Sequence, residues 1–181
     1  LPIQVNLVEG TAGIDDGGGA VKNKGYLSII QCAVSRHVAN QGGALYNFGK
    51  AAYAEIVSSV LSYNDVSQGL EGEGGATYNY QGELSITGCM YANNTAAKGG
   101  GDSVYTDGTI TIAASSFKDS DPFTDDDRLG DSAFGGSVVC VGGTINTMAG
   151  SDTCSQGKAC YVDSYSHLNT AVDEKASPII V

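Results

Sequence analysis

The chain contains no tryptophan, three prolines, two histidines and only nine lysine and arginine residues. Against 20 acidic residues these nine cations give a net charge of −11, which leaves no basic stripe for nucleic acid to bind. No apolar run approaches the ~20 residues that cross a membrane as a helix, so we expect no membrane insertion. No segment keeps helical periodicity over three turns, which argues against a helical fold. The sequence is instead rich in glycine, with 26 residues, and in short alternating segments.

A template recurs along the chain. It consists of a Gly-Gly opening, an asparagine, a turn glycine, an alternating strand and a second asparagine, and its clearest copy runs from Gly74 to Ala96. Openings at residues 18, 42, 74, 100 and 135 are separated by 24, 32, 26 and 35 residues. The alternation predicts β-strands, because successive side chains of a strand point to opposite faces. A repeat this short buries its apolar face only by stacking on its neighbours.

We therefore expect an all-β fold, a parallel β-helix or solenoid of about five to six coils. The expected single domain spans residues 1–181, with an N-terminal strand at 1–17, repeats at 18–150 and a C-terminal disulfide loop and tail at 151–181. Equivalent apolar residues should stack in two interior columns, which are Leu27, Ala54, Leu84 and Ile110, and Ile29, Ile56, Ile86 and Ile112.

Asparagines recur at fixed offsets in these repeats. One column contains Asn23, Asn47 and Asn79, each five residues after an opening glycine, and a second contains Asn64 and Asn94. Stacked amides can donate and accept along the stacking axis, so we expect both columns to form structural ladders. His37 falls in the second column and is interpreted as a stacked polar residue.

The openings Gly42-Gly43-Ala44-Leu45 and Gly74-Gly75-Ala76-Thr77, with the later Leu61-x-x-Asn64 and Tyr91-x-x-Asn94, carry a family resemblance. They resemble the GGA(I/L)…FxxN-type repeats of chlamydial polymorphic membrane proteins, and similar repeats occur in algal and protist extracellular proteins. The resemblance covers roughly residues 18–145. It implies a right-handed β-helix, a secreted or cell-surface location and adhesive or structural work, and it implies no catalytic residues.

The repeat is interrupted by a long acidic insertion between residues 120 and 135. Its neighbourhood holds six candidate calcium ligands, which are Asp119, Asp121, Asp125, Asp126, Asp127 and Asp131. Calcium takes six to eight oxygen ligands, and the alternative is a solvated acidic loop. A carbohydrate-cleaving pair, Asp119 or Asp121 with Glu71, is a further alternative. The absence of tryptophan and the mostly short corners argue against an enzyme.

Two covalent modifications are predicted. Cys154 and Cys160 flank a short polar segment and are the expected disulfide, typical of an oxidising compartment. Cys32 and Cys89 share a column two coils apart, too far for a disulfide, while Cys140 is left as a free thiol or an intersubunit bond. Asn93 belongs to the one Asn-x-Ser/Thr sequon of the chain and is the expected glycosylation site.

Both ends of the chain are apolar and strand-like, and we assign them to assembly through Ile3, Val5, Leu7, Ile179, Ile180 and Val181. The N-terminal strand either covers its own first coil or docks on another subunit. Because the chain begins at Leu1 without a signal peptide, we expect a piece processed from a secreted precursor. The expected function is that of an extracellular structural protein that assembles head to tail with itself into a filament, with glycans as further partners. The alternatives are an adhesin-like module of a larger surface protein and a carbohydrate-active β-helix.

Overall fold

The structure of the protein is a computed structural model. The structure describes residues 6–12, 17–66, 72–96, 104–117, 138–141, 144–147, 150–153, 159–162 and 168–171. Eighteen strands are present in these ranges, and no helix is found among them. The prediction of an all-β fold is therefore confirmed. In the part of the chain that the structure describes, no helix is long and apolar enough to cross a membrane.

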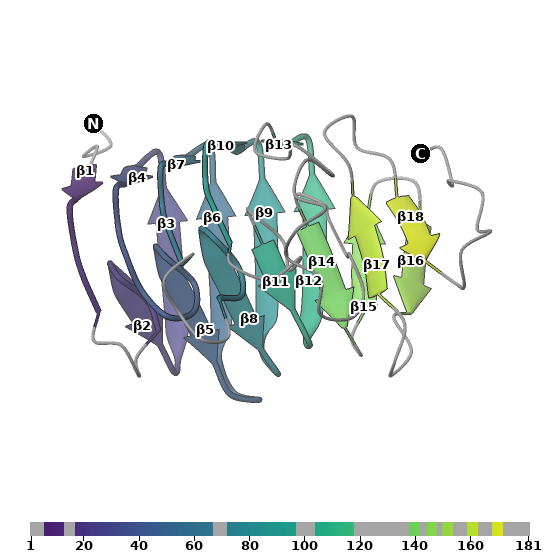
Figure 1. Cartoon of the computed structure of the whole chain (residues 1–181). Coiled ribbons are helices and arrows are strands. Elements are labelled where there is room, and N and C mark those ends of the chain that lie inside the picture. Colours follow the sequence, from purple (N-terminus) through teal and green to yellow (C-terminus); the bar gives the residue numbers. More distant parts are fainter. Residues whose placement is uncertain are drawn as a thin grey trace, which may run out of the picture.

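The strands form three sheets that run side by side along the molecule (Figure 1). The five-stranded sheet contains β1 (Asn6–Val8), β4 (Ala33–Ser35), β7 (Val60–Ser62), β10 (Met90–Ala92) and β13 (Ser116–Phe117). The seven-stranded sheet contains β2 (Val21–Asn23), β5 (Leu45–Phe48), β8 (Thr77–Tyr80), β11 (Val104–Thr106), β14 (Val138–Val141), β17 (Ala159–Val162) and β18 (Leu168–Ala171). The six-stranded sheet contains β3 (Tyr26–Ile30), β6 (Tyr53–Val57), β9 (Glu83–Thr87), β12 (Thr109–Ala113), β15 (Thr144–Thr147) and β16 (Gly150–Thr153).

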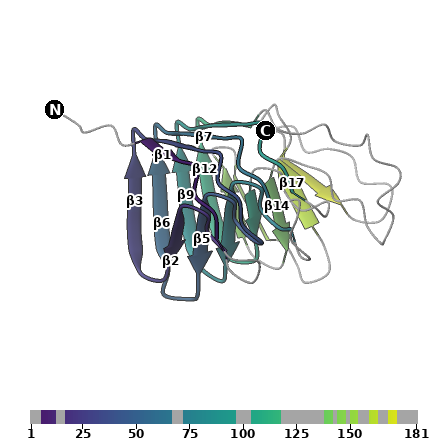
Figure 2. The ribbon, with the colours of Figure 1, turned by 60° about the vertical axis from the view of Figure 1, so that its left-hand side comes forward.

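The chain visits the three sheets in turn, and each visit adds a parallel strand beside the previous one. Strands β2, β3 and β4 are followed by β5, β6 and β7, which pair with them in parallel. Both predicted apolar columns are confirmed, because Leu27, Ala54, Leu84 and Ile110 are successive register partners, as are Ile29, Ile56, Ile86 and Ile112. Figure 2 shows the strands of the six-stranded sheet standing side by side. The fold is a parallel β-solenoid.

The coil turns its corners at residues with positive φ. Four of them follow the strands of the six-stranded sheet, at Gln31, Ser58, Gly88 and Ala114, with φ of 54°, 48°, 62° and 48°. Four more follow the strands of the five-stranded sheet, at Glu9, Arg36, Tyr63 and Asn93, with φ of 62°, 60°, 57° and 56°. Non-glycine residues in this left-handed region cost roughly 1–2 kcal/mol each. The same strained corner therefore recurs in each coil and must be stabilised by the stacking of neighbouring coils.

The paired glycines serve two different purposes at the third corner. Gly42 has a φ of 56°, which a side chain disfavours, whereas Gly43 lies against the next coil. A Cβ atom added at Gly43 would approach the carbonyl oxygen of Gly75 to 2.2 Å. The first glycine of the pair is thus needed for backbone conformation and the second for the close approach of successive coils.

The parallel winding stops near the C-terminal end. Strand β17 is antiparallel to β14, β18 is antiparallel to β17, and β16 is antiparallel to β15. The expected repeats at 18–150 thus contain parallel strands as far as β15, and the expected tail contributes antiparallel strands that the sequence did not predict. These strands lie at the opposite end of the molecule from β2 and β3 (Figure 1).

Candidate functional site

A column of asparagine amides runs through the interior between the six- and seven-stranded sheets. Asn23 Nδ2 donates to Asn47 Oδ1 at 2.7 Å, and Asn47 Nδ2 donates to Asn79 Oδ1 at 2.7 Å. Asn79 Nδ2 then donates to Thr106 Oγ1 at 2.8 Å. Each amide nitrogen also donates to a main-chain carbonyl, as Asn47 does to that of Glu83 at 3.0 Å. The column therefore links four successive coils and ties the seven-stranded sheet to the six-stranded one.

The second polar column lies beside the five-stranded sheet. The Asn64 side-chain nitrogen donates to Asn94 Oδ1 at 2.8 Å, and the His37 main-chain nitrogen donates to Asn64 Oδ1 at 3.1 Å. Asn64 and Asn94 are buried. Asn93 beside them is exposed, as is Thr95, the hydroxyl residue of its sequon. The structure thus places the predicted acceptor asparagine outward and its neighbour inward.

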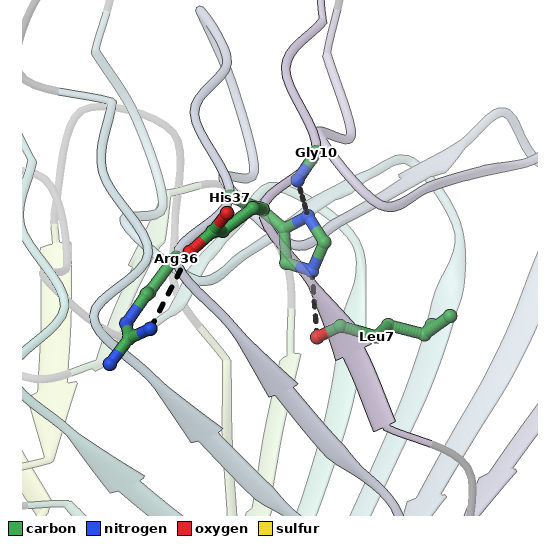
Figure 3. Close-up of polar contacts among 5 residues, drawn as sticks. Leu7, Gly10, Arg36 and His37 are labelled. Atoms are coloured by element: carbon green, nitrogen blue, oxygen red, sulfur yellow. Dashed lines mark hydrogen bonds and ion pairs between the residues drawn. The ribbon is translucent and has the colours of Figure 1, made fainter.

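His37 ends this column and holds the N-terminal segment (Figure 3). The Gly10 main-chain N–H donates to His37 Nδ1 at 2.8 Å, so Nδ1 accepts and Nε2 carries the proton. Nε2–H in turn donates to the carbonyl oxygen of Leu7 at 3.0 Å. An exposed ion pair of 3.5 Å between Arg36 and Glu9 lies beside them and contributes little to stability. His37 is therefore a structural residue that holds β1 and the residues after it beside β4 of the same chain.

The N-terminal end of the solenoid is the candidate functional surface. Strands β2 and β3 are the first strands of their sheets, and no other described strand pairs with their outer edges. Tyr26 and Ile30 of β3 are 72% and 48% exposed. Interior residues of this first coil, such as Leu27 and Val21, are only partly buried, whereas their partners Ala54 and Leu45 in the next coil are fully buried.

The free edge of β3 offers main-chain hydrogen-bonding groups. Gly25 O accepts from Tyr53 N–H and Gln31 N–H donates to Val57 O, so the odd-numbered residues of this segment pair with β6. Because alternate residues of a parallel strand pair with opposite neighbours, the N–H and C=O groups of Tyr26, Ser28 and Ile30 face the outer edge. This end thus offers main-chain groups that have no partner in any described strand, together with partly exposed apolar side chains. These are the two features that recruit a further strand.

Aromatic rings form stacks along the seven-stranded sheet, which the sequence analysis did not predict. Tyr46 and Tyr78 stack at a centroid distance of 5.2 Å, and Phe48 and Tyr80 stack at 5.3 Å. Lys22 Nζ lies 5.4 Å from the centroid of the Tyr46 ring. The signal was the aromatic residue that precedes asparagine in both repeats. Burial raises the pKa of Tyr78 well above its ordinary value, so its phenol stays protonated.

A further column alternates cysteine and serine. The main-chain nitrogen of Cys32 donates to Ser59 Oγ at 3.0 Å, and that of Cys89 donates to Ser115 Oγ at 3.1 Å. Cys32 and Cys89 are free thiols. Cys89 is buried, and this burial raises the pKa of its thiol.

Other candidate residues of the sequence lie outside the described residues. They are Ile3, Val5, Glu71, Asp119, Asp121, Asp125, Asp126, Asp127, Asp131, Cys154, Ile179, Ile180 and Val181. Cys160 lies in β17, and its register partner in β14 is Cys140. Among the residues that the structure describes, no group of three or more His, Cys, Asp or Glu side chains could hold a metal ion.

Comparison of the chain with protein-family models, with curated proteins and with solved structures found no match.

Proposed function

We propose that this protein is an extracellular structural subunit that assembles head to tail with itself into a filament or surface appendage. The observation that carries the proposal is the open N-terminal end, where β2 and β3 end their sheets and apolar interior residues remain partly exposed. The proposal assigns no catalytic role. It takes the solenoid to be right-handed and to contain five to six coils, on the strength of the repeat resemblance.

The strand directions at the two ends favour such a joint. In the seven-stranded sheet, β18 follows two reversals after β14, so it runs in the same direction as β2. A second copy could therefore place its β2 beside β18 in parallel, as in the repeats. In the six-stranded sheet, β16 runs opposite to β3, so the same joint would be antiparallel there. A contact between unlike ends that does not close into a ring generates a filament.

The pairing of β1 bears on which surface would make the proposed joint. β1 pairs with β4 of its own chain, and Leu7 packs against the core. We therefore place the joint at the edges of β2 and β3, and not at a donated segment 1–7. The C-terminal Ile179, Ile180 and Val181 remain candidates for the opposite side of the joint.

The experiment compares Ser28→Pro with Ser28→Ala. Proline removes the N–H of Ser28, which faces the outer edge of β3, and its fixed φ is tolerated on edge strands. The hydroxyl of Ser28 lies 2.7 Å from Glu55 Oε1, and alanine removes this contact while keeping the N–H. Light scattering and electron microscopy should show filaments for the wild type and Ser28→Ala, and loss of filaments for Ser28→Pro.

Circular dichroism should show the same strand content in all three proteins, because the substituted N–H pairs with no described strand. Equal assembly of Ser28→Pro and the wild type would contradict a joint at β3. A wild type that stays monomeric at high concentration would favour the alternative of an adhesin-like module of a larger protein.

A second candidate function is carbohydrate binding, which the aromatic stacks favour. Stacked, half-buried rings such as Phe48 and Tyr80, with Lys22 and Lys24 nearby, resemble platforms on which sugar rings pack. Titration with a panel of soluble oligosaccharides, monitored by calorimetry, should then detect binding that Phe48→Ala weakens. Absence of binding across the panel would remove this candidate.

A further inference from the structure

Two cysteines are brought together at the point where the parallel winding ends. Cys140 lies in β14 and Cys160 lies in β17, and the antiparallel register makes them direct partners. They are 20 residues apart in the sequence, and the intervening chain contains β15 and β16. The pairing could not be read from cysteine spacing, because it depends on the reversal of direction between β14 and β17.

The backbone geometry of such a pair suits a disulfide. Directly opposite residues of antiparallel strands have Cα atoms about 5.5 Å apart at hydrogen-bonded positions and about 4.5 Å apart at the others. Disulfides join Cα atoms about 4.4–6.8 Å apart, so either kind of position is compatible.

The other described cysteines are held elsewhere. Cys32 and Cys89 belong to the column of cysteine and serine at the corner between the six- and five-stranded sheets. Cys89 Sγ lies 3.2 Å from the carbonyl oxygen of Ile56 and is buried. Neither residue lies in the seven-stranded sheet, where β14 and β17 pair.

We propose that Cys140 and Cys160 form a disulfide that fastens the antiparallel strands β17 and β18 to the last parallel strand of their sheet. This pairing replaces the expected Cys154–Cys160 bond and leaves Cys154 as the unpaired cysteine of the C-terminal region. The bond would hold in place the end of the seven-stranded sheet that the proposed filament joint uses, but it does not depend on that function.

Formation of the bond requires an oxidant, which is a second disulfide such as oxidised glutathione or the active-site disulfide of an oxidoreductase. One cysteine thiolate attacks this disulfide and forms a mixed disulfide, releasing one thiol. The second thiolate then attacks the mixed disulfide, releasing the second thiol and closing the Cys140–Cys160 bond. The two cysteines lose two electrons and two protons in total, and the oxidant becomes two thiols.

The test is a disulfide map of the full chain, equilibrated with a mixture of reduced and oxidised glutathione. Free thiols are alkylated in denaturant, and the peptides are identified by mass spectrometry without reduction. We expect one cross-linked peptide pair containing Cys140 and Cys160, with alkylation at Cys32, Cys89 and Cys154. A Cys154→Ser variant should keep the cross-link, and Cys140→Ser should lose it.

Thermal unfolding supplies an independent measurement. Dithiothreitol should lower the midpoint of the wild type and of Cys154→Ser, and it should leave that of Cys140→Ser unchanged. Alkylation of all five cysteines after equilibration would overturn the proposal. A cross-link between Cys154 and Cys160, lost in Cys154→Ser, would also overturn it and would restore the pairing expected from spacing.

Discussion

Replacing Asn47 by leucine removes the central amide of a fully buried polar column. Asn47 accepts a hydrogen bond from Asn23 and donates to Asn79 and to the carbonyl oxygen of Glu83. Leucine has a similar size but neither donor nor acceptor. Asn23 Nδ2 keeps two hydrogen-bond acceptors, the carbonyl oxygens of Gly25 and Tyr53. The main loss therefore falls on Asn79 Oδ1 and the carbonyl oxygen of Glu83, which lose the hydrogen bonds that Asn47 donates.

The magnitude follows from these groups. Each buried acceptor that loses its donor costs about 1–3 kcal/mol, so the two together cost about 2–6 kcal/mol. Burial of the leucine side chain offsets about 1.5–3 kcal/mol of this. Taken at their midpoints, these two terms leave a net destabilisation of about 2 kcal/mol for Asn47→Leu. For a chain of this length it corresponds to a fall in the melting temperature of roughly 4–8 °C.

The assay is thermal unfolding followed by circular dichroism, with denaturant unfolding as a second measure. Thr87→Leu is the matched control, because it makes a similar polar-to-leucine change on an exposed position of β9. The control should change the free energy of unfolding by less than about 0.5 kcal/mol. If Asn47→Leu unfolds at the wild-type temperature, the amide column does not stabilise the stacking of coils.

Three further predictions concern single residues. His37→Phe should leave the core folded but should raise amide hydrogen exchange in residues 6–12 at least several-fold, because Gly10 and Leu7 lose their ring partner; unchanged exchange would contradict its anchoring role. Native material should carry a glycan at the exposed Asn93, and mass spectrometry showing peptide 90–98 only at its bare mass would exclude this. Burial raises the pKa of Asp107, so the folded state binds the proton more tightly than the unfolded state. The ionised carboxylate therefore destabilises the folded state, and this destabilisation is present in full only above the folded-state pKa. Asp107→Asn should therefore raise the melting temperature at pH 7 and leave it unchanged at about pH 2, and an equal effect at both pH values would refute the assignment.

Much of the repeat architecture could be predicted from the sequence. Register in a stacked coil is fixed by which residues face inward, and the alternation around Leu84 and Ile86 left one choice of interior face. The offset of Asn47 and Asn79 from the paired glycines likewise placed them in one column. Such features are local and recur, so each copy supports the interpretation of the others.

The remaining features depend on contacts that do not recur. Thr106 occupies the position that asparagine holds in the earlier repeats. An additional glycine at residues 99–101 leaves the offset of Thr106 from the opening glycine ambiguous in the sequence. The reversal after β14 has no earlier copy among the described strands, so neither the antiparallel strands nor the pairing of Cys140 with Cys160 could be predicted. The positive φ of Tyr63 and Ala114 also escaped prediction, because such residues adopt this conformation only where stacked coils impose it.

We propose that the stacking of strands within the chain continues from one chain to the next. Electron cryo-microscopy of the concentrated native protein tests this proposal. We expect unbranched filaments whose averaged images repeat at about 4.7–4.9 Å along the filament axis, the spacing of neighbouring strands. Single particles at every concentration, or filaments with that spacing across the axis, would contradict it.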